Sequence, residues 1–399
     1  MTLTRRRLFA AAAGLGAARP AAAAAWAEIE RAGRGQTVFW NAWGGDERTN
    51  AFIAWAAGRM AGDHGVEVRH VRLRDTAEAV TRVVAEKAAG RSAGGSVDLI
   101  WINGPNFLAM KQQGLLHGPV LDLLPHAALV DREGKPATLV DFTVPTEGYE
   151  VPWRMARVVF VHDAARVPAP PRSMAALADW AVVHPGRLAH PSVRNFLGAT
   201  FLKQALAELA ADATVLQAPA TDDNFMPVTA PLWAWYGAMR PHLWRGGRNF
   251  PDSGPSLRGL MNDGEIDIMI SFNPSEASVA IANGTLPPSV RTFVLAGGTI
   301  GNCSFNAIPF NAAHKEGALL LCDFLLTPEA QAKAMDPAMM GSPTVLALDR
   351  LAPAERKRFD DLPRPPATLS DGELGRPLPE PHPSWMTRIA TAWETLVNA

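Results

Sequence analysis

The feature that most constrains this chain is a strand, a tight turn and a helix that follow one another directly over residues 97–114. The apolar run 97–102 is too short for an independent helix and does not alternate, which is typical of a parallel strand buried on both faces. After a polar turn, Pro105 stands at the first helical position, where a missing N–H costs nothing. The sequence therefore predicts Trp101, Asn103 and a helix N-terminus at the carboxyl end of a parallel strand, where open α/β sheets bind ligands.

The segments before this unit repeat the same order of strand and helix. Apolar and aromatic residues predict strands over 37–43 and 66–73, and amphipathic segments predict helices over 46–62 and 75–89. Because strands joined through helices lie parallel with right-handed crossovers, the chain should begin with a doubly wound α/β sheet. The loops after its strands share one edge, to which the first strand contributes Trp40, Asn41, Trp43 and Gly44.

The second half of the chain predicts a core of its own. Strands are expected over 265–272, 290–295 and 301–308, and helices over 195–211, 232–243 and 313–326. A mature chain of about 370 residues also exceeds the size to which a single hydrophobic core usually grows. Two α/β domains are therefore expected.

The start of the sequence predicts an export signal. Three arginines at 5–7 precede an apolar run over 8–18 that is too short to span a bilayer, and residues 25–27 form an A-x-A cleavage site. The arginines resemble the twin-arginine type of signal, with an ordinary Sec signal as the alternative. Because no cysteine near residue 27 could take a lipid anchor, we expect a soluble periplasmic protein.

Charge and composition exclude several other classes of protein. The full chain has a formal net charge of −1, and cleavage at residue 27 removes four arginines and no acidic residue, so no basic block indicates nucleic-acid binding. No later apolar run of about 18 residues predicts a membrane span. The motifs GxSxG, HExxH and GxxxxGKS/T are absent, and the ten His show no metal-ligand spacing. We therefore expect no enzymatic activity, no cofactor and no resident metal.

The two cysteines leave alternatives open. Cys303 and Cys322 could pair in an oxidising compartment, although Cys322 lies in an apolar helical run and is more simply a core residue. A secreted enzyme could use Cys303 as a nucleophile with His190 or His314 as its base. Against that interpretation, Cys303 lies inside a predicted strand.

Four segments together resemble the YnjB-type solute-binding proteins of ABC importers, relatives of the thiamine, iron and polyamine binders. The segments are NAWGG, EKAAGRSAGGSVDLIWINGPNFLAMKQQGLLHGP, YEVPWR and AIPFNAAHKEGALLLCDFLLTPEAQ. The resemblance implies the type II periplasmic binding protein fold, with two α/β lobes, each a mainly parallel sheet flanked by helices, and a ligand cleft between them. Lobe one would comprise 36–150 and 292–336, and lobe two 153–290 and 337–399, with the first crossing near Val151 and Pro152. The implied partners are a small molecule and inner-membrane permease subunits, and the protein is expected to be a monomer.

The resemblance also implies which residues line the cleft. Besides the residues that follow the first and third strands, it places Trp153 and Arg154 at the crossing. Lobe two would contribute the following residues: Ser192, Arg194, Asn195, Asn273, Ser275 and Glu276. Any of the tryptophans could instead be a core residue, and Arg154 could instead form an ion pair with Glu150 that supports the hinge.

The residues leave the charge of the cargo open. Twelve Trp against two Tyr suit a flat cation such as thiamine, with Glu276 or Asp46 as its counter-charge. An anion held by Arg154, Arg194 and helix N-termini is the alternative. A bare ferric ion is not favoured, because the usual cluster of tyrosines cannot be made from two.

Overall fold

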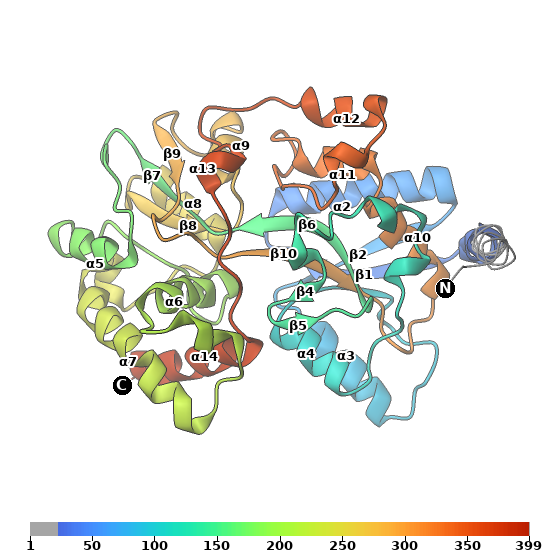
Figure 1. Cartoon of the computed structure of the whole chain (residues 1–399), viewed down its shortest axis with the longest axis horizontal. Helices are drawn as coiled ribbons and strands as arrows, with labels where there is room; N and C mark the ends of the chain where they lie inside the picture. Colours follow the sequence, from blue (N-terminus) through green and yellow to red (C-terminus); the bar gives the residue numbers. More distant parts are fainter. Residues whose placement is uncertain (1–22, 399) are drawn as a thin grey trace, which may run out of the picture.

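A computed structural model describes residues 23–398, which form two lobes side by side (Figure 1). The first lobe is built on a sheet with the strand order β2-β1-β3-β10-β6, and the second on a sheet with the order β8-β7-β9. The first sheet contains β1 (Thr37–Trp43), β2 (Glu67–Leu73), β3 (Leu99–Ile102), β6 (Glu150–Arg157) and β10 (Gly301–Ala307). The second contains β7 (Val159–Asp163), β8 (Ile268–Ser271) and β9 (Val290–Phe293).

The first lobe has the predicted alternation of strands and helices. Strand β1 pairs in parallel with β2 and β3, and β10 runs antiparallel to both β3 and β6. The strands alternate with α2 (Glu47–Arg59), α3 (Ala77–Ala88) and α4 (Pro105–Gln112). Local chemistry fixes the helix starts, since the Asp46 side chain accepts from the Thr49 N–H and Pro105 is the first residue of α4.

Strand β3 is covered on both faces, as its unbroken apolar run predicts. Leu99 packs into the cluster under α2 and α10 (Lys315–Leu325), whereas Ile100 and Ile102 pack into the cluster under α3 and α4. Trp101 faces the same side as Leu99 and is only partly buried. The period of two along this strand thus directs the Trp101 ring toward the face on which β1 and β6 place their own tryptophans.

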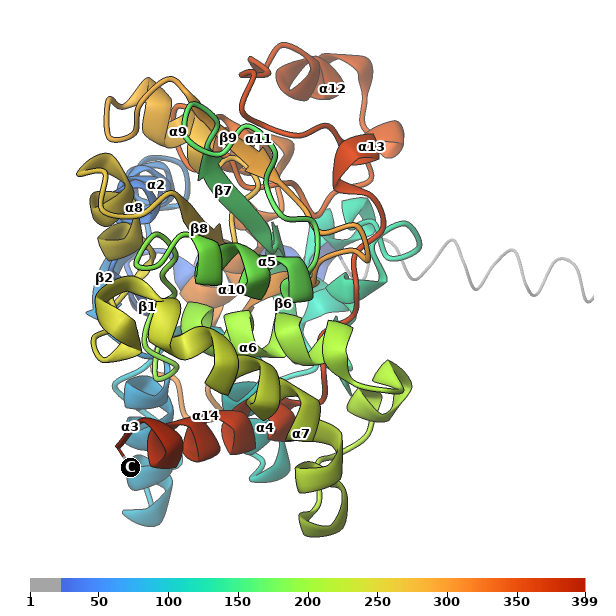
Figure 2. The same ribbon diagram turned by 90° about the vertical axis from the view of Figure 1, so that its left-hand side faces the viewer.

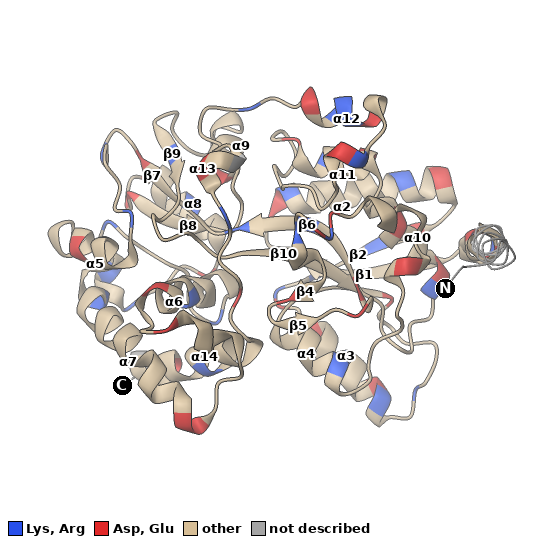
Figure 3. Cartoon of the chain, in the orientation of Figure 1, with Lys and Arg blue, Asp and Glu red and all other residues tan. Residues whose placement is uncertain are grey.

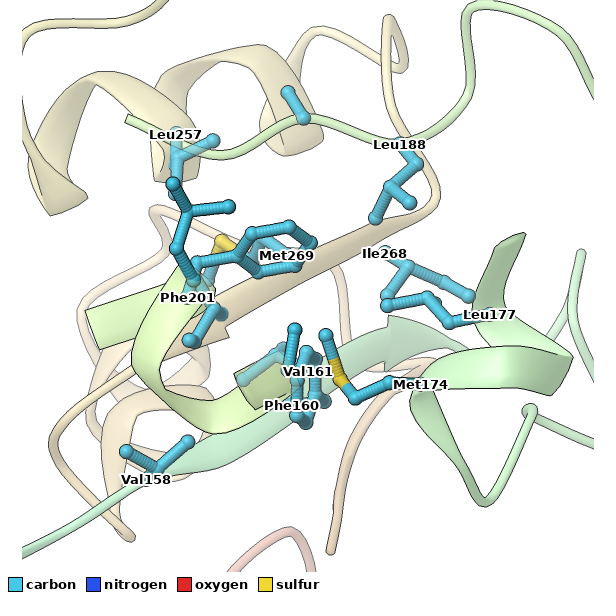
Figure 4. Close-up of a cluster of buried hydrophobic side chains, with 14 of the residues drawn as sticks. Val158, Phe160, Val161, Met174, Leu177, Leu188, Phe201, Leu257, Ile268 and Met269 are labelled. Atoms are coloured by element: carbon cyan, nitrogen blue, oxygen red, sulfur yellow. The ribbon is translucent and has the colours of Figure 1, made fainter. Parts of the chain in front are cut away.

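The second lobe differs from the mainly parallel sheet that was expected. Strand β7 runs antiparallel to both β8 and β9. Its outer side is covered by α5 (Met174–Val183), α6 (Phe196–Leu209) and α7 (Asp222–Met239), which face the viewer in Figure 2. Figure 4 shows the core beneath them, where Phe160 and Val161 of β7 meet Ile268 of β8 and Leu177 of α5.

The chain passes between the lobes at positions that differ from the prediction. Strand β6 stays paired with β10 as far as Arg157, so the first crossing falls at Val158 and not near Val151 and Pro152. The second crossing follows β9, which pairs with β7 and therefore places residues 292–293 in the second lobe. A third connection runs from α12 (Pro353–Asp360) through α13 (Asp371–Leu374) to α14 (Pro383–Asn398), and Figure 1 shows it descending between the lobes.

The segment after residue 336 is shared between the two lobes, whereas the sequence assigned all of it to lobe two. Met340, Val345, Leu346 and Phe359 pack into the core of the first lobe, because the chain after α11 (Pro328–Met335) returns over that lobe. The chain beyond residue 360 packs on the second lobe, through Ala367, Leu378 and α14. The expected assignment of 337–399 to lobe two is therefore wrong for 337–360.

The remaining elements are short. They are β4 (Val140–Asp141), β5 (Val144–Pro145), α8 (Gly254–Asn262) and α9 (Glu276–Ala282). No helix within residues 23–398 is both long and apolar enough to cross a membrane. Charged residues of both signs are interspersed over the two lobes (Figure 3). The predicted export signal at 5–18 lies outside the described residues, and its cleavage site at 25–27 lies in a helix over 23–33.

Candidate functional site

A cleft of about 770 Å³ lies between the two lobes. The first lobe contributes the carboxyl ends of β1 and β3, together with β6 and β10, and the second contributes the start of α6 and the end of β8. Nine of the residues expected at the site line this cleft: Trp43, Trp101, Asn103, Arg154, Ser192, Arg194, Asn195, Asn273 and Glu276. A cleft of this size is in the range that takes a small organic molecule.

Three of the expected residues are buried in the first lobe, away from the cleft. Trp40 is 0% exposed, and its indole Nε1 donates to Asn306 Oδ1 at 3.0 Å. Trp153 is 1% exposed and stacks on Phe52. Asn41 is 0% exposed and donates to the Phe39 carbonyl at 3.0 Å. Trp40 and Trp153 are core residues because their strands direct these two side chains toward α2.

Two further residues expected at the site, Gly44 and Ser275, lie where neighbouring segments of the chain pack closely against each other. A side chain at Gly44 would overlap Arg72 on β2, so this glycine lets the end of β1 pass close to its neighbouring strand. Ser275 is 7% exposed, and Gly341 of the first lobe lies directly against it, since a Cβ on Gly341 would come within 2.4 Å of Ser275 Cβ. Ser275 therefore marks a place where the lobes touch beside the cleft.

Arg154 is the principal charge at the base of the cleft. It lies on β6 opposite Ser304 of β10, and its Nε lies 3.3 Å from Ser304 Oγ. Its Nη1 lies 3.3 Å from Ser342 Oγ, which approaches from the segment after α11. Burial lowers the pKa of Arg154 to about 10, so the guanidinium remains charged at neutral pH. Within residues 23–398, no carboxylate lies within ion-pair distance of it.

The neighbouring rings hold Arg154 in place. Its guanidinium carbon lies 4.5 Å from the centre of the Trp101 ring and 4.9 Å from that of Trp153, and the two rings meet edge to face at 5.2 Å. The alternative of an ion pair with Glu150 is wrong. Both carboxylate oxygens of Glu150 lack a hydrogen-bond partner among the described residues, and burial raises the pKa of this carboxyl well above its usual range.

Four charged residues form an inter-lobe charge network beside the cleft. Arg48 of α2 donates from Nη2 to Glu276 Oε2 at 2.9 Å, and Arg258 of α8 donates from Nη1 to Glu276 Oε1 at 2.6 Å. Asp46 lies 3.3 Å from Arg48 and 3.8 Å from Arg258. Although burial opposes it, the two carboxylates raise the pKa of Arg48. The network joins the first lobe to the second, and its two positive and two negative charges cancel.

Most amide side chains around the cleft are already bonded to the protein. Asn103 Nδ2 donates to Asp141 Oδ1 at 3.1 Å and to the Cys303 carbonyl at 2.7 Å. Asn195 caps α6 by accepting from the Leu197 N–H. Asn273 Nδ2 donates to the Met340 carbonyl at 2.6 Å, across the two lobes. These amide groups therefore stabilise turns and contacts between the lobes, and most of their donors are not free to bind a ligand.

Aromatic side chains face the cleft from both lobes. Trp43 lies against Gly45, where a Cβ would come within 2.5 Å of the indole. Phe196 and Phe272 of the second lobe lie 5.8 Å apart, ring centre to ring centre, and both are half-buried. The site is thus a cleft with aromatic walls and one guanidinium at its base.

Sequence reasoning missed several residues of the cleft. Arg48 lies two residues after the helix cap Asp46, so its place at the cleft edge could have been inferred from the helix start. Ser304 alternates with the buried Cys303 along β10, which would also have placed it. Arg258 and Ser342 carried no such signal, because only the tertiary fold brings them to the cleft.

The cysteines and histidines give no support to an enzymatic centre. Cys303 and Cys322 are both free and buried, and burial raises the pKa of the Cys303 thiol well above its usual range, which disfavours the thiolate. His190 is buried beside Tyr236, and His314 bonds Asp98. In the part of the chain that the structure describes, no group of three or more His, Cys, Asp or Glu side chains could hold a metal ion.

Comparison with known proteins identifies sequence relatives. Residues 55–349 match the family model of the bacterial extracellular solute-binding proteins. Protein YnjB of Escherichia coli K12 is 38% identical over 368 residues, which cover 92% of each chain.

Solved structures of low sequence identity share the fold. The periplasmic binding protein AfuA of Actinobacillus pleuropneumoniae, with fructose-6-phosphate bound, matches with a TM-score of 0.64 at 14% identity and covers 91% of this chain and 99% of AfuA. The Tp0655 lipoprotein of Treponema pallidum matches with a TM-score of 0.65 at 15% identity, covering 90% and 99%. The spermidine/putrescine-binding protein PotD of Streptococcus pneumoniae matches with a TM-score of 0.61 at 13% identity, covering 91% and 98%. The expected type II periplasmic binding protein fold is confirmed.

Proposed function

Because this chain belongs to the family of bacterial extracellular solute-binding proteins, we propose that it is the periplasmic ligand-capturing component of an ABC import system. In this role it binds a small molecule between its lobes, closes around it by rotation at the crossing strands, and delivers it to permease subunits in the inner membrane. The cargo we propose is a small organic anion. No nucleic acid takes part, and the protein acts as a monomer.

The observation that carries the charge of the cargo is Arg154. A half-buried guanidinium that lacks a carboxylate partner is costly in the free protein, and an anionic group on the ligand would supply that partner. The hydroxyls of Ser304 and Ser342 stand beside it and could donate to the same anion. We therefore place the charged group of the cargo at Arg154.

A thiamine-like cation suits this cleft less well. The exposed face of Trp101 that would stack on a cation already carries the Arg154 guanidinium at 4.5 Å, so a second positive charge there would be repelled. The carboxylates of Glu276 and Asp46, expected as counter-charges, are occupied by Arg48 and Arg258. The fold itself leaves the sign open, since AfuA has a sugar phosphate bound and PotD is a polyamine-binding protein.

Thermal unfolding tests this proposal with a panel of organic anions and cations added to the purified protein. A ligand at about 100 times its Kd adds about 2.7 kcal/mol of stability, which corresponds to a rise in Tm of roughly 5–10 °C for lobes of this size. We expect such a rise from anions, its loss in Arg154→Gln, and its retention in Arg69→Gln, which alters an exposed ion pair on β2. A rise from thiamine or spermidine with none from any anion would refute the proposed cargo.

A further inference from the structure

We infer that the cleft takes an amphipathic monoanion, in which one carboxylate- or sulfonate-type group is attached to a flat apolar body. This inference rests on the anion-binding function proposed above and names the chemical class of its cargo. Four properties of the cleft support it: its net charge, its volume, the side chains of its walls and the state of its polar groups.

Among the described residues, Arg154 is the one unpaired charge in the interior of the cleft, since Arg74, Asp75 and Asp252 also line it but are exposed. The inter-lobe charge network contributes nothing net, because Glu276 and Asp46 neutralise Arg48 and Arg258. Arg194 lies exposed and is paired with Glu394 at 2.6 Å. The unpaired guanidinium of Arg154 therefore matches a single negative charge, whereas a dianion such as a phosphate monoester would bring one charge too many.

The volume requires a body as well as a charged group. A water molecule occupies about 30 Å³, so an inorganic anion of a few times that volume would fill only a small part of the 770 Å³ cleft. Because the interior of a closed binding site is filled mostly by its ligand, the cargo must extend well beyond its anionic group.

The walls that would enclose this body are apolar and come equally from both lobes. The first lobe contributes half-buried side chains that line the cleft from β1, β3 and β6, and the second contributes them from α6, β8 and α14. These side chains are Trp43, Trp101, Met155, Phe196, Phe272 and Met386. Aromatic rings offer flat faces, and the unbranched Met side chains adapt to the edge of a ring system.

The polar groups around the cleft are poorly suited to a sugar. The amide Nδ2 atoms of Asn103 and Asn273 donate to the protein, the Asn195 amide caps α6, and the Thr49 and Thr76 hydroxyls bond Asp46 and the Trp101 carbonyl. Apart from the Ser304 and Ser342 hydroxyls beside Arg154 and the Asn106 amide, a polyhydroxylated ligand would therefore find few free partners for its hydroxyls after losing their hydration. Because these polar groups already form hydrogen bonds within the protein, the cleft favours a ligand whose body has no hydrogen-bonding groups.

Isothermal titration calorimetry with matched probes tests the inference. The probes are a series of aryl and alkyl carboxylates and sulfonates, with 3-phenylpropionate as the reference, 3-phenylpropylamine for the same body with the opposite charge, acetate for the group alone, and glucose 6-phosphate for a polar body. We expect members of the first series to bind at least tenfold more tightly than acetate and glucose 6-phosphate, and the amine not to bind. Arg154→Gln should weaken the best binder at least tenfold.

Wall variants separate packing from charge. Met386→Ser and Phe272→Ser should each weaken the best apolar-bodied anion by about three- to tenfold while leaving acetate unaffected. Trp180→Ala is the matched control, because Trp180 stacks on His184 and does not line the cleft. Unfolding curves of each variant show that it is folded before binding is measured.

The outcomes distinguish this inference from the function on which it rests. Tightest binding of glucose 6-phosphate, with loss in Arg154→Gln, would overturn the apolar monoanion and leave the anion-binding function intact. Preferential binding of 3-phenylpropylamine would overturn both. Failure of every apolar-bodied anion in the series, or binding that Arg154→Gln does not weaken, would also overturn the inference.

Discussion

Replacing Glu276 by Gln should weaken the closed arrangement of the lobes. The substitution keeps the size of the side chain and removes the charge that bridges Arg48 of the first lobe and Arg258 of the second. Both bonds join charged groups, at 2.9 and 2.6 Å, and the side chains of the three residues are 9–17% exposed. Only the bond to Arg48 spans the lobes, so its loss should act mainly on closure.

The size of the effect follows from this partial burial. A charge-assisted hydrogen bond contributes about 1.5–3 kcal/mol when buried, and an exposed ion pair about 0–1 kcal/mol. A half-buried inter-lobe bond should therefore contribute about 1–2 kcal/mol. That free energy corresponds to a five- to thirtyfold fall in the ratio of closed to open molecules.

Two measurements together detect this shift. If closed molecules dominate without ligand, solution scattering of Glu276→Gln should give a larger radius of gyration than wild type. If they are a minority, the Kd for the cargo should rise five- to thirtyfold, because the binding-competent state is rarer. Glu67→Gln, which removes an exposed ion pair with Arg69 inside the first lobe, is the control and should change neither. An unchanged radius together with an unchanged Kd in Glu276→Gln would refute the role of this network in closure.

Four further variants have distinct expected results. Burial raises the pKa of Asp141 from 3.8 to about 7, so between these values the folded state holds a proton that the unfolded state releases. The resulting contribution to stability is present below about pH 4 and is lost as pH rises to 7. In denaturant unfolding from pH 4.5 to 8, the wild-type free energy of unfolding should fall by on the order of 2–4 kcal/mol, and Asp141→Asn should flatten this fall. Gly45→Ala should push the Trp43 ring aside, because the new Cβ would lie 2.5 Å from it, and should lower affinity several-fold in calorimetry with little change in Tm. Trp101→Ala should cost about 1–3 kcal/mol of binding, whereas Trp385→Ala, a fully buried residue, should cost about 3–5 kcal/mol of folding stability and leave the affinity of folded protein intact.

The first lobe was predictable because its signals are local. The strand expected over 37–43 coincides with β1, and the strand, turn and helix around Pro105 are present as expected. Each of these elements is fixed by its own apolar pattern and by a cap or a proline beside it. Long-range contacts therefore had little influence on where these elements begin and end.

Helix α7 shows where local signals mislead. The sequence predicts this helix from 232, but it begins at Asp222 and contains Pro227 and Pro231. Its first turn is held by a capping box between Thr221 and Asn224, and the turns that follow are held by the burial of Leu232 and Tyr236 in the core of the second lobe. Tertiary packing thus outweighs the cost of two prolines, which no pattern within the segment reveals.

The candidate site divides in the same way. Alternation along β1 turns Val38, Trp40 and Ala42 into the core, so the period of two could have separated Trp40 from Trp43. The partners of the charged residues could not be predicted from the sequence, since Arg48 and Glu276 lie 228 residues apart and meet only when the two lobes close. The sign of the cargo depended on that pairing, which is why composition favoured a cation and geometry favours an anion.

The most direct test is to identify the small molecule that stays bound when the protein is purified from the periplasm. Native mass spectrometry of wild-type protein, followed by denaturation and analysis of the released molecule, gives its mass and charge. We expect a monoanion with an apolar body, retained by wild-type protein and absent from Arg154→Gln purified in parallel. A cationic molecule, or one retained equally by Arg154→Gln, would show that Arg154 does not bind an anionic cargo between the lobes.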